Sequence, residues 1–341
     1  MIVLFILLLI VCLYGIKYKT FHEDYMSKQS TNAIKGIFAM IILFSHMRGY
    51  LVLSENWMNK AYIDVLDYIG QAMVAMYLFY SGYGIMESVK CKESYRETFF
   101  VNRIVKTLIN FDLAVFLYLI FNIVRGVQYT YMQYVTCWIG WESIGNSNWF
   151  IFDILVLYLI VYFGMLLCKE CQIYRKRFCF ITFLLSLLLW IILRIVKGEP
   201  WWVNTIFTFP LGIYFSIIKQ KFEMVINKNY FFVTLVVGCF LCIWHNFRGD
   251  DGLGIYTCVF SILVVLLSMK VKMNNVILQW LGKNAFSIYI LQRLPMHLYS
   301  TCGLSITTPP IFVLLSVLTT LLLSYFFTMV TKRVDKYIII N

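Results

Sequence analysis

Long apolar runs separated by short polar connections fill most of the 341-residue chain. A helix rises about 1.5 Å per residue, so crossing the roughly 30 Å hydrocarbon core of a bilayer takes about 20 apolar residues. The apolar runs that approach this length lie at residues 2–16, 34–53, 69–88, 107–124, 149–168, 178–196, 202–218, 230–247, 253–269, 278–299 and 311–330. The pattern therefore predicts an all-α fold, a polytopic integral membrane helix bundle of about 11 transmembrane helices.

The composition leaves a bilayer as the solvent for such a chain. Hydrophobic residues make up 61% of it and charged residues 13%, about half the charged fraction of roughly 25% found in soluble domains. These values exclude a water-soluble globule. The first apolar run has no basic residue before it and no small-residue cleavage pattern after it, so we expect an uncleaved helix and not a secretory signal.

Lys and Arg residues fall mainly in alternate connections between the expected spans. When the alternation is followed along the chain, 22 of the 29 bases collect on one side. The positive-inside rule places that side in the cytoplasm, so we expect the N-terminus outside and the C-terminus in the cytoplasm. The net charge of +12 then reflects orientation in the cell membrane, and no nucleic-acid partner is expected.

A histidine inside the second expected span is the first candidate for chemistry. His46 follows Lys35 by 11 residues, which at about 100° per residue places both on one helix face, with their backbones roughly 16 Å apart. His46 can act as a general base, since the pKa of free imidazole is near neutrality, or it can hydrogen-bond a neighbouring helix. Lys35 can bind an anion or simply anchor the helix at the cytoplasmic face. With a cation at the cytoplasmic end of the helix and a base deep in the membrane, the pair suits an extended donor molecule that has an anionic group at one end and a reactive group at the other.

These residues resemble a motif of the acyltransferase 3 family of polytopic membrane acyltransferases, which includes many bacterial polysaccharide O-acetyltransferases. The family's first core helix carries a basic residue, ten intervening residues and a histidine, and Lys35 to His46 is similar to it. The chain departs from the family pattern at two positions, since the family usually has Arg in place of Lys35 and commonly Asp in place of Asn32. Lysine keeps the charge but loses bidentate phosphate binding.

Further segments are similar to family motifs. Phe79-Tyr80-Ser81-Gly82-Tyr83 resembles an aromatic-x-Ser-Gly-aromatic motif, and Arg103 stands in a segment similar to the family's basic cytoplasmic re-entry. Trp149-Phe150 opens a span as family members often do, and residues 281–290 also resemble the family. Where the family often has a second histidine, this chain has Gln292. The likeness covers roughly residues 30–330, which implies a division into 1–30, an additional N-terminal helix with a basic cytoplasmic connection, and 31–341, an acyltransferase 3-like membrane domain.

The resemblance implies a membrane O-acyltransferase. The expected donor is cytoplasmic acyl-CoA, specifically acetyl-CoA, which is a co-substrate, so no cofactor is expected. The expected acceptor is a hydroxyl of a cell-envelope or capsular glycan, or of a lipid-linked glycan. Direct transfer is the simplest scheme, because no histidine lies near Ser81 in sequence to make it an acyl carrier.

The site residues expected on this basis fall into three groups. His46 is the catalytic base, and the basic residues Lys35, Arg103, Arg96 and Lys106 are candidates to bind the phosphates of acyl-CoA, although the positive-inside rule also accounts for the basic third connection. Small residues at Ser81-Gly82 can equally serve close helix packing. The residues expected to line the substrate site are Ser81, Tyr83, Trp149 and Asp153. No metal site is expected.

Two other functions remain open on the residues alone. A polytopic transporter or flippase of a polysaccharide or lipid-linked glycan would use His46 and the buried acids as proton relays, but no recognisable repeat relates the two halves of the chain. A polysaccharide polymerase would be expected to carry a large extracytoplasmic loop. Consumption of acetyl-CoA by the purified protein separates these functions from acyl transfer.

Overall fold

The computed structural model describes residues 2–92, 94–168, 174–247, 249, 252–273 and 275–338. The helices of the first half are α1 (Ile2–Leu13), α2 (Lys28–Met47), η1 (Arg48–Tyr50), α3 (Trp57–Cys91), α4 (Tyr95–Phe99), η2 (Phe100–Val105), α5 (Lys106–Val124), α6 (Tyr131–Thr136), η3 (Cys137–Ile139) and α7 (Trp149–Leu167). Those of the second half are α8 (Tyr174–Val196), η4 (Pro200–Trp202), α9 (Thr208–Phe247), α10 (Leu253–Lys270), α11 (Val276–Lys283), α12 (Ala285–Leu291), α13 (Arg293–Thr301), α14 (Leu304–Thr307) and α15 (Pro309–Ile338). Two short strands, β1 (Lys17–Tyr18) and β2 (Val271–Lys272), pair antiparallel.

The fold is an all-α membrane fold. Within the described part of the chain, six helical segments are long and apolar enough to cross a bilayer, namely Tyr95–Val124, Trp149–Leu167, Lys176–Val196, Thr208–Phe247, Leu253–Lys270 and Pro309–Ile338. Each of the eleven expected spans overlaps a helix. The seventh begins at the end of η4 and continues into α9, and the eighth lies in the same helix, beyond the non-helical residue Asn229. The tenth is divided among α11, α12 and α13. The number of crossings stays a prediction.

Two helices begin well before the apolar runs that predicted them. α2 starts at Lys28 because the Ser27 side chain caps it by accepting a hydrogen bond from the Ser30 amide. α3 starts at Trp57, where the Asn56 side chain caps it in the same way through the Asn59 amide. The polar first turns of both helices therefore extend beyond the hydrophobic runs, and in α2 this extension adds Lys28 to the same helix as Lys35 and His46.

Helices distant in sequence cross at glycines. At the crossing of α2 and α11, a Cβ added to Gly282 would lie 1.8 Å from the Asn32 carbonyl oxygen, and one added to Gly36 would lie 2.4 Å from that of Leu278. At the crossing of α3 and α9, Gly82 and Gly212 each leave room for the other helix, with Phe209 O and Phe79 O both at 2.1 Å from the missing Cβ positions. Small residues at such crossings let membrane helices approach closely.

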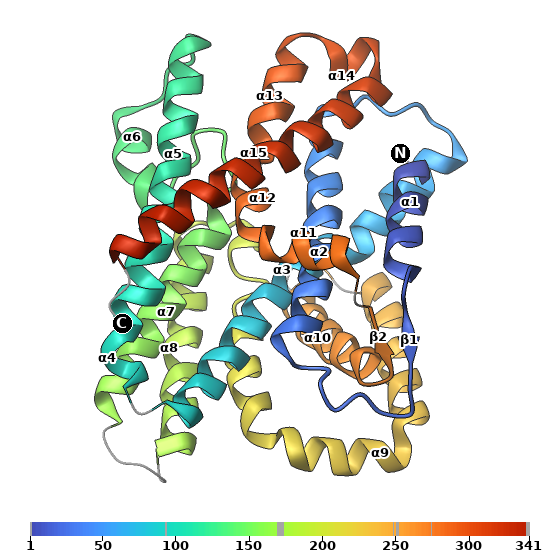
Figure 1. Cartoon of the computed structure of the whole chain (residues 1–341), viewed down its shortest axis with the longest axis vertical. Coiled ribbons are helices and arrows are strands. Elements are labelled where there is room, and N and C mark those ends of the chain that lie inside the picture. Colours follow the sequence, from blue (N-terminus) through green and yellow to red (C-terminus); the bar gives the residue numbers. More distant parts are fainter. Residues whose placement is uncertain are drawn as a thin grey trace.

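These crossings place α2 and α3 in the middle of the molecule. Figure 1 shows α5, α7 and α8 on one side of them, and α9, α10 and the β1–β2 pair on the other. The pair joins the chain after α1 to the chain after α10 through Lys17 opposite Lys272 and Tyr18 opposite Val271. An ion pair between Asp24 and Lys272 reinforces this connection next to the start of α2.

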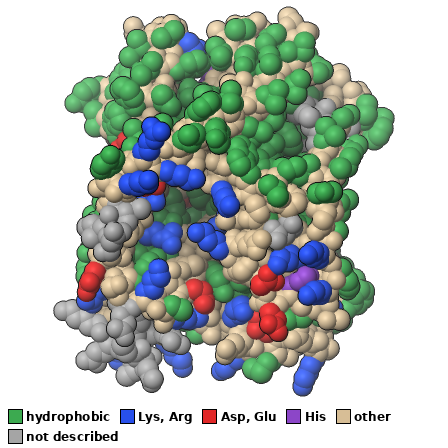
Figure 2. Space-filling view, in the orientation of Figure 1, with side chains coloured by type: hydrophobic (Ala, Val, Ile, Leu, Met, Phe, Trp, Pro, Cys, Tyr) green, Lys and Arg blue, Asp and Glu red, His purple; other side chains and the backbone are tan. Residues whose placement is uncertain are grey.

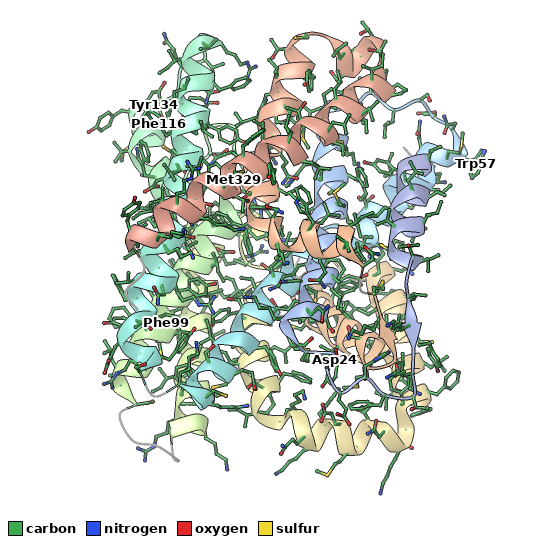
Figure 3. The ribbon with its side chains drawn as sticks, in the orientation of Figure 1. Asp24, Trp57, Phe99, Phe116, Tyr134 and Met329 are labelled. Atoms are coloured by element: carbon green, nitrogen blue, oxygen red, sulfur yellow. The ribbon has the colours of Figure 1, made fainter. Side chains whose placement is uncertain are left out.

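The outer surface carries many large apolar side chains, as a lipid-facing surface should. Phe116 on α5, Met329 on α15 and Trp57 at the start of α3 are 54%, 43% and 76% exposed, and Figure 3 shows all three. Phe99, in contrast, is fully buried. In Figure 2, hydrophobic side chains dominate the upper half of the face, whereas Lys and Arg side chains gather around a hollow in the lower half. On this face, therefore, basic and hydrophobic side chains occupy different parts of the surface.

Candidate active site

A cavity of about 730 Å³ opens between α2, α3, η2, α7 and the α11–α12 pair. Of the described residues that line it, the cationic ones are Lys28, Lys35, Arg103 and Lys283, and the acidic one is Glu87. The Glu87 carboxylate already accepts hydrogen bonds from Lys90 Nζ at 2.8 Å and Ser216 Oγ at 2.6 Å. The cavity therefore carries an excess of positive charge. We call the region of the four cations the basic end.

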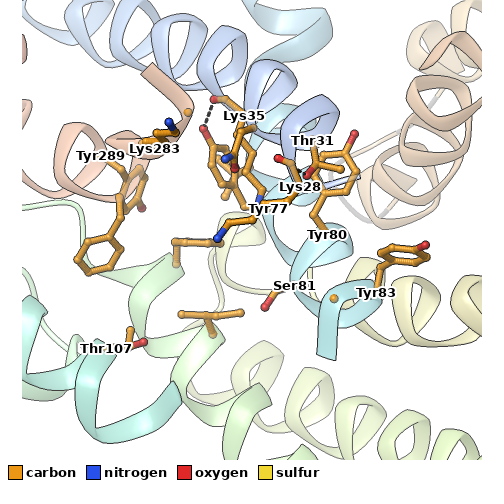
Figure 4. Close-up of a pocket in the computed structure, with 18 of the residues that line it drawn as sticks. Lys28, Thr31, Lys35, Tyr77, Tyr80, Ser81, Tyr83, Thr107, Lys283 and Tyr289 are labelled. Atoms are coloured by element: carbon orange, nitrogen blue, oxygen red, sulfur yellow. Dashed lines mark hydrogen bonds between the residues drawn. The ribbon is translucent and has the colours of Figure 1, made fainter. Parts of the chain in front are cut away.

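Lys35 reaches the cavity from the second turn of α2. Its backbone carbonyl accepts a hydrogen bond of 2.6 Å from the Tyr77 hydroxyl, which ties α2 to α3 (Figure 4). Its Nζ lies 5.7 Å from the centre of the Tyr80 ring, a cation–π contact. No carboxylate pairs with Lys35 among the residues that the structure describes. The ammonium group is therefore available to an anionic ligand.

Arg103 faces the same cavity from an unusual helical turn. It lies in η2, a six-residue π-helix inserted between α4 and α5. Such turns are rare and occur frequently at functional sites, because the extra residue changes which side chains face inward. The Arg103 Nε donates a hydrogen bond of 3.2 Å to the neutral Tyr95 hydroxyl. Among the described residues, no carboxylate forms an ion pair with its guanidinium.

The Ser-Gly motif of α3 divides between the cavity and helix packing. Ser81 lines the cavity, and its Oγ shares a hydrogen bond of 2.9 Å with the Tyr158 hydroxyl of α7. Gly82 faces the other way and packs against the Phe209 carbonyl of α9. Tyr83 lines the cavity as well. Figure 4 shows Ser81 and Thr107 across the cavity from Lys35 and Lys283.

His46 lies behind one wall of the cavity. The wall residue is Tyr289 of α12, whose ring centre is 6.3 Å from that of His46, and Phe150 of α7 packs edge-on against Tyr289 at 5.4 Å. Both Tyr289 and Phe150 line the cavity. The Nδ1 atom of His46 is buried and has no hydrogen-bond partner in the described part of the chain. We call the region of Tyr289, Phe150 and His46 the inner end.

The other residues expected at the site lie outside the cavity lining. Arg96 is exposed on α4, and Lys106 forms an ion pair of 2.8 Å with Asp335 of α15. Trp149 packs beside Phe150, with ring centres 6.2 Å apart. Asp153 is fully buried in α7, and neither carboxylate oxygen has a hydrogen-bond partner within residues 2–338 as far as they are described. The structure thus brings Lys35, Arg103, Ser81 and Tyr83 together, with His46 one side chain away.

Several lining residues were not anticipated from the sequence. Lys28 precedes Lys35 by seven residues, which places both on one face of α2. Had the predicted helix begun at residue 28, the sequence would have indicated that Lys28 belongs to the site. Lys283 reaches the cavity only because Gly282 packs against Asn32. Tyr158 comes from a helix far along the chain, and no local signal marks it. Tyr289 lies within residues 281–290, which resemble the family, but the sequence did not assign it to the site. No group of three His, Cys, Asp or Glu side chains in the described residues could hold a metal ion.

The fold and the cavity define a multi-pass membrane protein with an internal basic site. A family model described as an acyltransferase domain matches residues 28–329, nearly the whole chain. The chain therefore belongs to the acyltransferase 3 family and is a membrane acyltransferase. No curated protein and no solved structure matches it significantly. The matched region begins at the first residue of α2, so α1 and β1 precede it.

Proposed function

We propose that the protein transfers an acetyl group from cytoplasmic acetyl-CoA to a hydroxyl of a cell-envelope or capsular glycan, with His46 as the general base. The observation that carries this proposal is the single cavity that joins a basic end to a wall in contact with His46. An acyl-CoA has the same division, because its phosphates are anionic and its thioester is neutral. The volume of about 730 Å³ lies within the range of roughly 300–1,000 Å³ typical of small-molecule sites.

The basic end suits the phosphates of the donor. Arg103 offers a planar fork for phosphate oxygens, whereas Lys35 offers a point charge. Lys28 and Lys283 add two further cations to the same space. Under the positive-inside rule this end faces the cytoplasm, where acyl-CoA is found. The donor would then extend along α2 toward His46, over the roughly 16 Å that 11 helical residues span.

The inner end suits the chemical step. A ring nitrogen of His46 takes the proton of the acceptor hydroxyl, whose oxygen attacks the thioester carbonyl carbon. The carbon–sulfur bond breaks, and the CoA thiolate leaves and takes the proton back from the imidazolium. Ser81 shares its hydrogen bond with Tyr158 and not with a histidine, which supports direct transfer without an acyl-enzyme.

The test measures acetyl transfer by the purified full-length protein in nanodiscs. Labelled acetyl-CoA is supplied with envelope glycan from the host strain, and CoA release and labelled glycan are both quantified. A positioned base contributes about 10²- to 10⁴-fold, so we expect His46→Ala to lose activity by that factor. His46→Gln is the sharper variant, because an amide can hydrogen-bond a neighbouring helix but cannot accept a proton at neutral pH. Near wild-type acetylation by His46→Gln would overturn the role of His46 as the general base, whereas absence of both CoA release and labelled glycan with the wild-type protein would overturn acetyl transfer and favour a transporter.

The orientation is tested separately. We propose an extracytoplasmic N-terminus and a cytoplasmic C-terminus, which places Lys35 on the side of the donor. Reporter domains fused at either terminus, one active only in the cytoplasm and one only outside, should give opposite results at the two ends. Cytoplasmic activity of the N-terminal fusion, or external activity of the C-terminal fusion, would contradict the eleven-span arrangement.

A further inference from the structure

Tyr289 is a side chain of the cavity wall that lies next to His46. It lies on α12, is 7% exposed, and lines the cavity (Figure 4). Its ring is 6.3 Å from the His46 ring and 5.4 Å from that of Phe150. A thioester placed beside His46 from the cavity would therefore lie close to Tyr289.

The hydroxyl of Tyr289 differs from those of most neighbouring tyrosines. Tyr77 donates to the Lys35 carbonyl at 2.6 Å, Tyr158 pairs with Ser81 at 2.9 Å, and Tyr118 donates to the Ile290 carbonyl at 3.1 Å. The Tyr289 hydroxyl is buried and forms no hydrogen bond of standard geometry with a described residue; the backbone N–H of Phe150 approaches its oxygen, which leaves the hydroxyl proton free to donate. Buried polar groups are nearly always paired in native proteins, so an unpaired one in a cavity wall points to a ligand atom.

A second cavity tyrosine shares this property but not the location. Within the described residues the Tyr80 hydroxyl is also buried without a partner. Its ring, however, lies 5.7 Å from Lys35 Nζ, at the basic end. Among these tyrosines, Tyr289 combines a hydroxyl proton that has no acceptor among the described residues with a ring next to that of the proposed base.

We propose that Tyr289 is a second catalytic residue, whose hydroxyl donates a hydrogen bond to the thioester carbonyl oxygen during acyl transfer. This inference rests on the proposed function. As the acceptor oxygen bonds to the carbonyl carbon, the carbonyl electron pair moves onto oxygen, and the Tyr289 hydroxyl stabilises that charge while keeping its own proton. The pair returns when the carbon–sulfur bond breaks, and the thiolate is protonated by His46. A fixed donor in a site that excludes water is effective because it needs no reorganisation.

The decisive variant is Tyr289→Phe, which removes the hydroxyl and keeps the ring against His46 and Phe150. Loss of one such donor typically lowers kcat about 10²- to 10³-fold, and we expect that loss with little change in the affinity for acetyl-CoA measured by calorimetry. Tyr299→Phe is the matched control. Its hydroxyl pairs with Thr319 at 2.7 Å outside the cavity lining, so its kcat should stay near that of the wild type.

Two outcomes would overturn the inference. A Tyr289→Phe protein with kcat within about threefold of the wild type would show that the hydroxyl does not act on the reaction. If His46→Gln is inactive in the same assay, only the role of Tyr289 fails and the proposed function stands. The second measurement needs no variant: the infrared stretch of a ¹³C-labelled thioester carbonyl should shift to lower frequency when acetyl-CoA binds the wild-type protein. An unshifted band would refute the hydrogen bond even if Tyr289→Phe failed to fold.

Discussion

The two ends of the cavity are built from different side chains. The basic end has four cationic side chains, Lys28, Lys35, Arg103 and Lys283. Its acidic lining residue, Glu87, is already paired with Lys90. At the inner end, Tyr289 and Phe150 form an aromatic wall in front of His46. The first arrangement suits an anionic ligand, and under the proposed function the second would surround the reacting group with few, fixed polar atoms.

This difference separates binding from chemistry. A charge contact to a distant phosphate is the same in the ground state and in the transition state, so it changes affinity and not the rate of the chemical step. Groups that touch the reacting atoms act only as charge develops on them. Variants at the two ends should therefore have opposite kinetic signatures.

The largest expected effect at the basic end belongs to Lys35→Ala and Arg103→Ala. A hydrogen bond to a charged group contributes about 1.5–3 kcal/mol, which corresponds to about 10- to 100-fold in affinity. We expect the Kd for acetyl-CoA, measured by calorimetry, and the KM to rise by this factor in each variant, with kcat nearly unchanged.

Lys35→Arg is the control for the charge at this position. It keeps the cation and adds a planar fork for phosphate, so its affinity should equal or exceed that of the wild type. Unchanged acetyl-CoA affinity in both alanine variants, or a fall in kcat alone, would remove the distinction between the two ends.

A smaller effect is expected where the basic end depends on helix packing. Gly282 lines the cavity, and a Cβ there would lie 1.8 Å from the Asn32 backbone oxygen, which has no flexible side chain to yield. Overpacking of this kind costs typically 1–3 kcal/mol. Gly282→Ala should therefore lower the thermal midpoint in detergent and weaken acetyl-CoA binding by separating α11 from α2.

Gly238→Ala is the matched control for that substitution. Gly238 lies inside α9, and none of the described atoms comes within 4 Å of its missing Cβ. Because alanine favours a helix by about 1 kcal/mol over glycine, this variant should be as stable as the wild type or more so. Equal losses in both variants would contradict the prediction, because they would show that the added methyl group acts independently of the crossing of α11 and α2.

Much of the fold was predictable because apolar runs of membrane length are a strong local signal. Every expected span overlaps a helix, whereas the starts of α2 and α3 were missed because hydropathy does not register polar capped turns. Ser27 and Asn56 are the residues that cap them. A search for N-cap residues ahead of each run would have lengthened both helices.

The candidate site was less predictable, because it depends on contacts between distant segments. Helical spacing places Lys35 and His46 on one face of α2, but it does not show that Tyr289 of the cavity wall lies next to His46. Arg103 faces the cavity from a π-helix, and the periodicity of an ordinary helix does not anticipate one. Lys283 depends on the contact of Gly282 with Asn32, 250 residues away in sequence.

The smallest expected effect concerns Arg96 and Lys106, two candidate phosphate-binding residues that the structure places outside the cavity lining. Arg96 is exposed on α4, and Lys106 is held by Asp335 at 2.8 Å while its neighbour Thr107 lines the cavity. A surface charge contributes little to binding a ligand that it does not touch, since solvent and salt screen it within about 10 Å. We expect Arg96→Ala and Lys106→Ala to keep acetyl-CoA affinity within about twofold of the wild type at physiological salt.

Lys106→Ala should lower the thermal midpoint slightly, because it leaves Asp335 without its cation, while Arg96→Ala should not. A tenfold loss of affinity in Arg96→Ala would extend the basic end to α4 and show that the phosphates of the donor reach beyond the cavity.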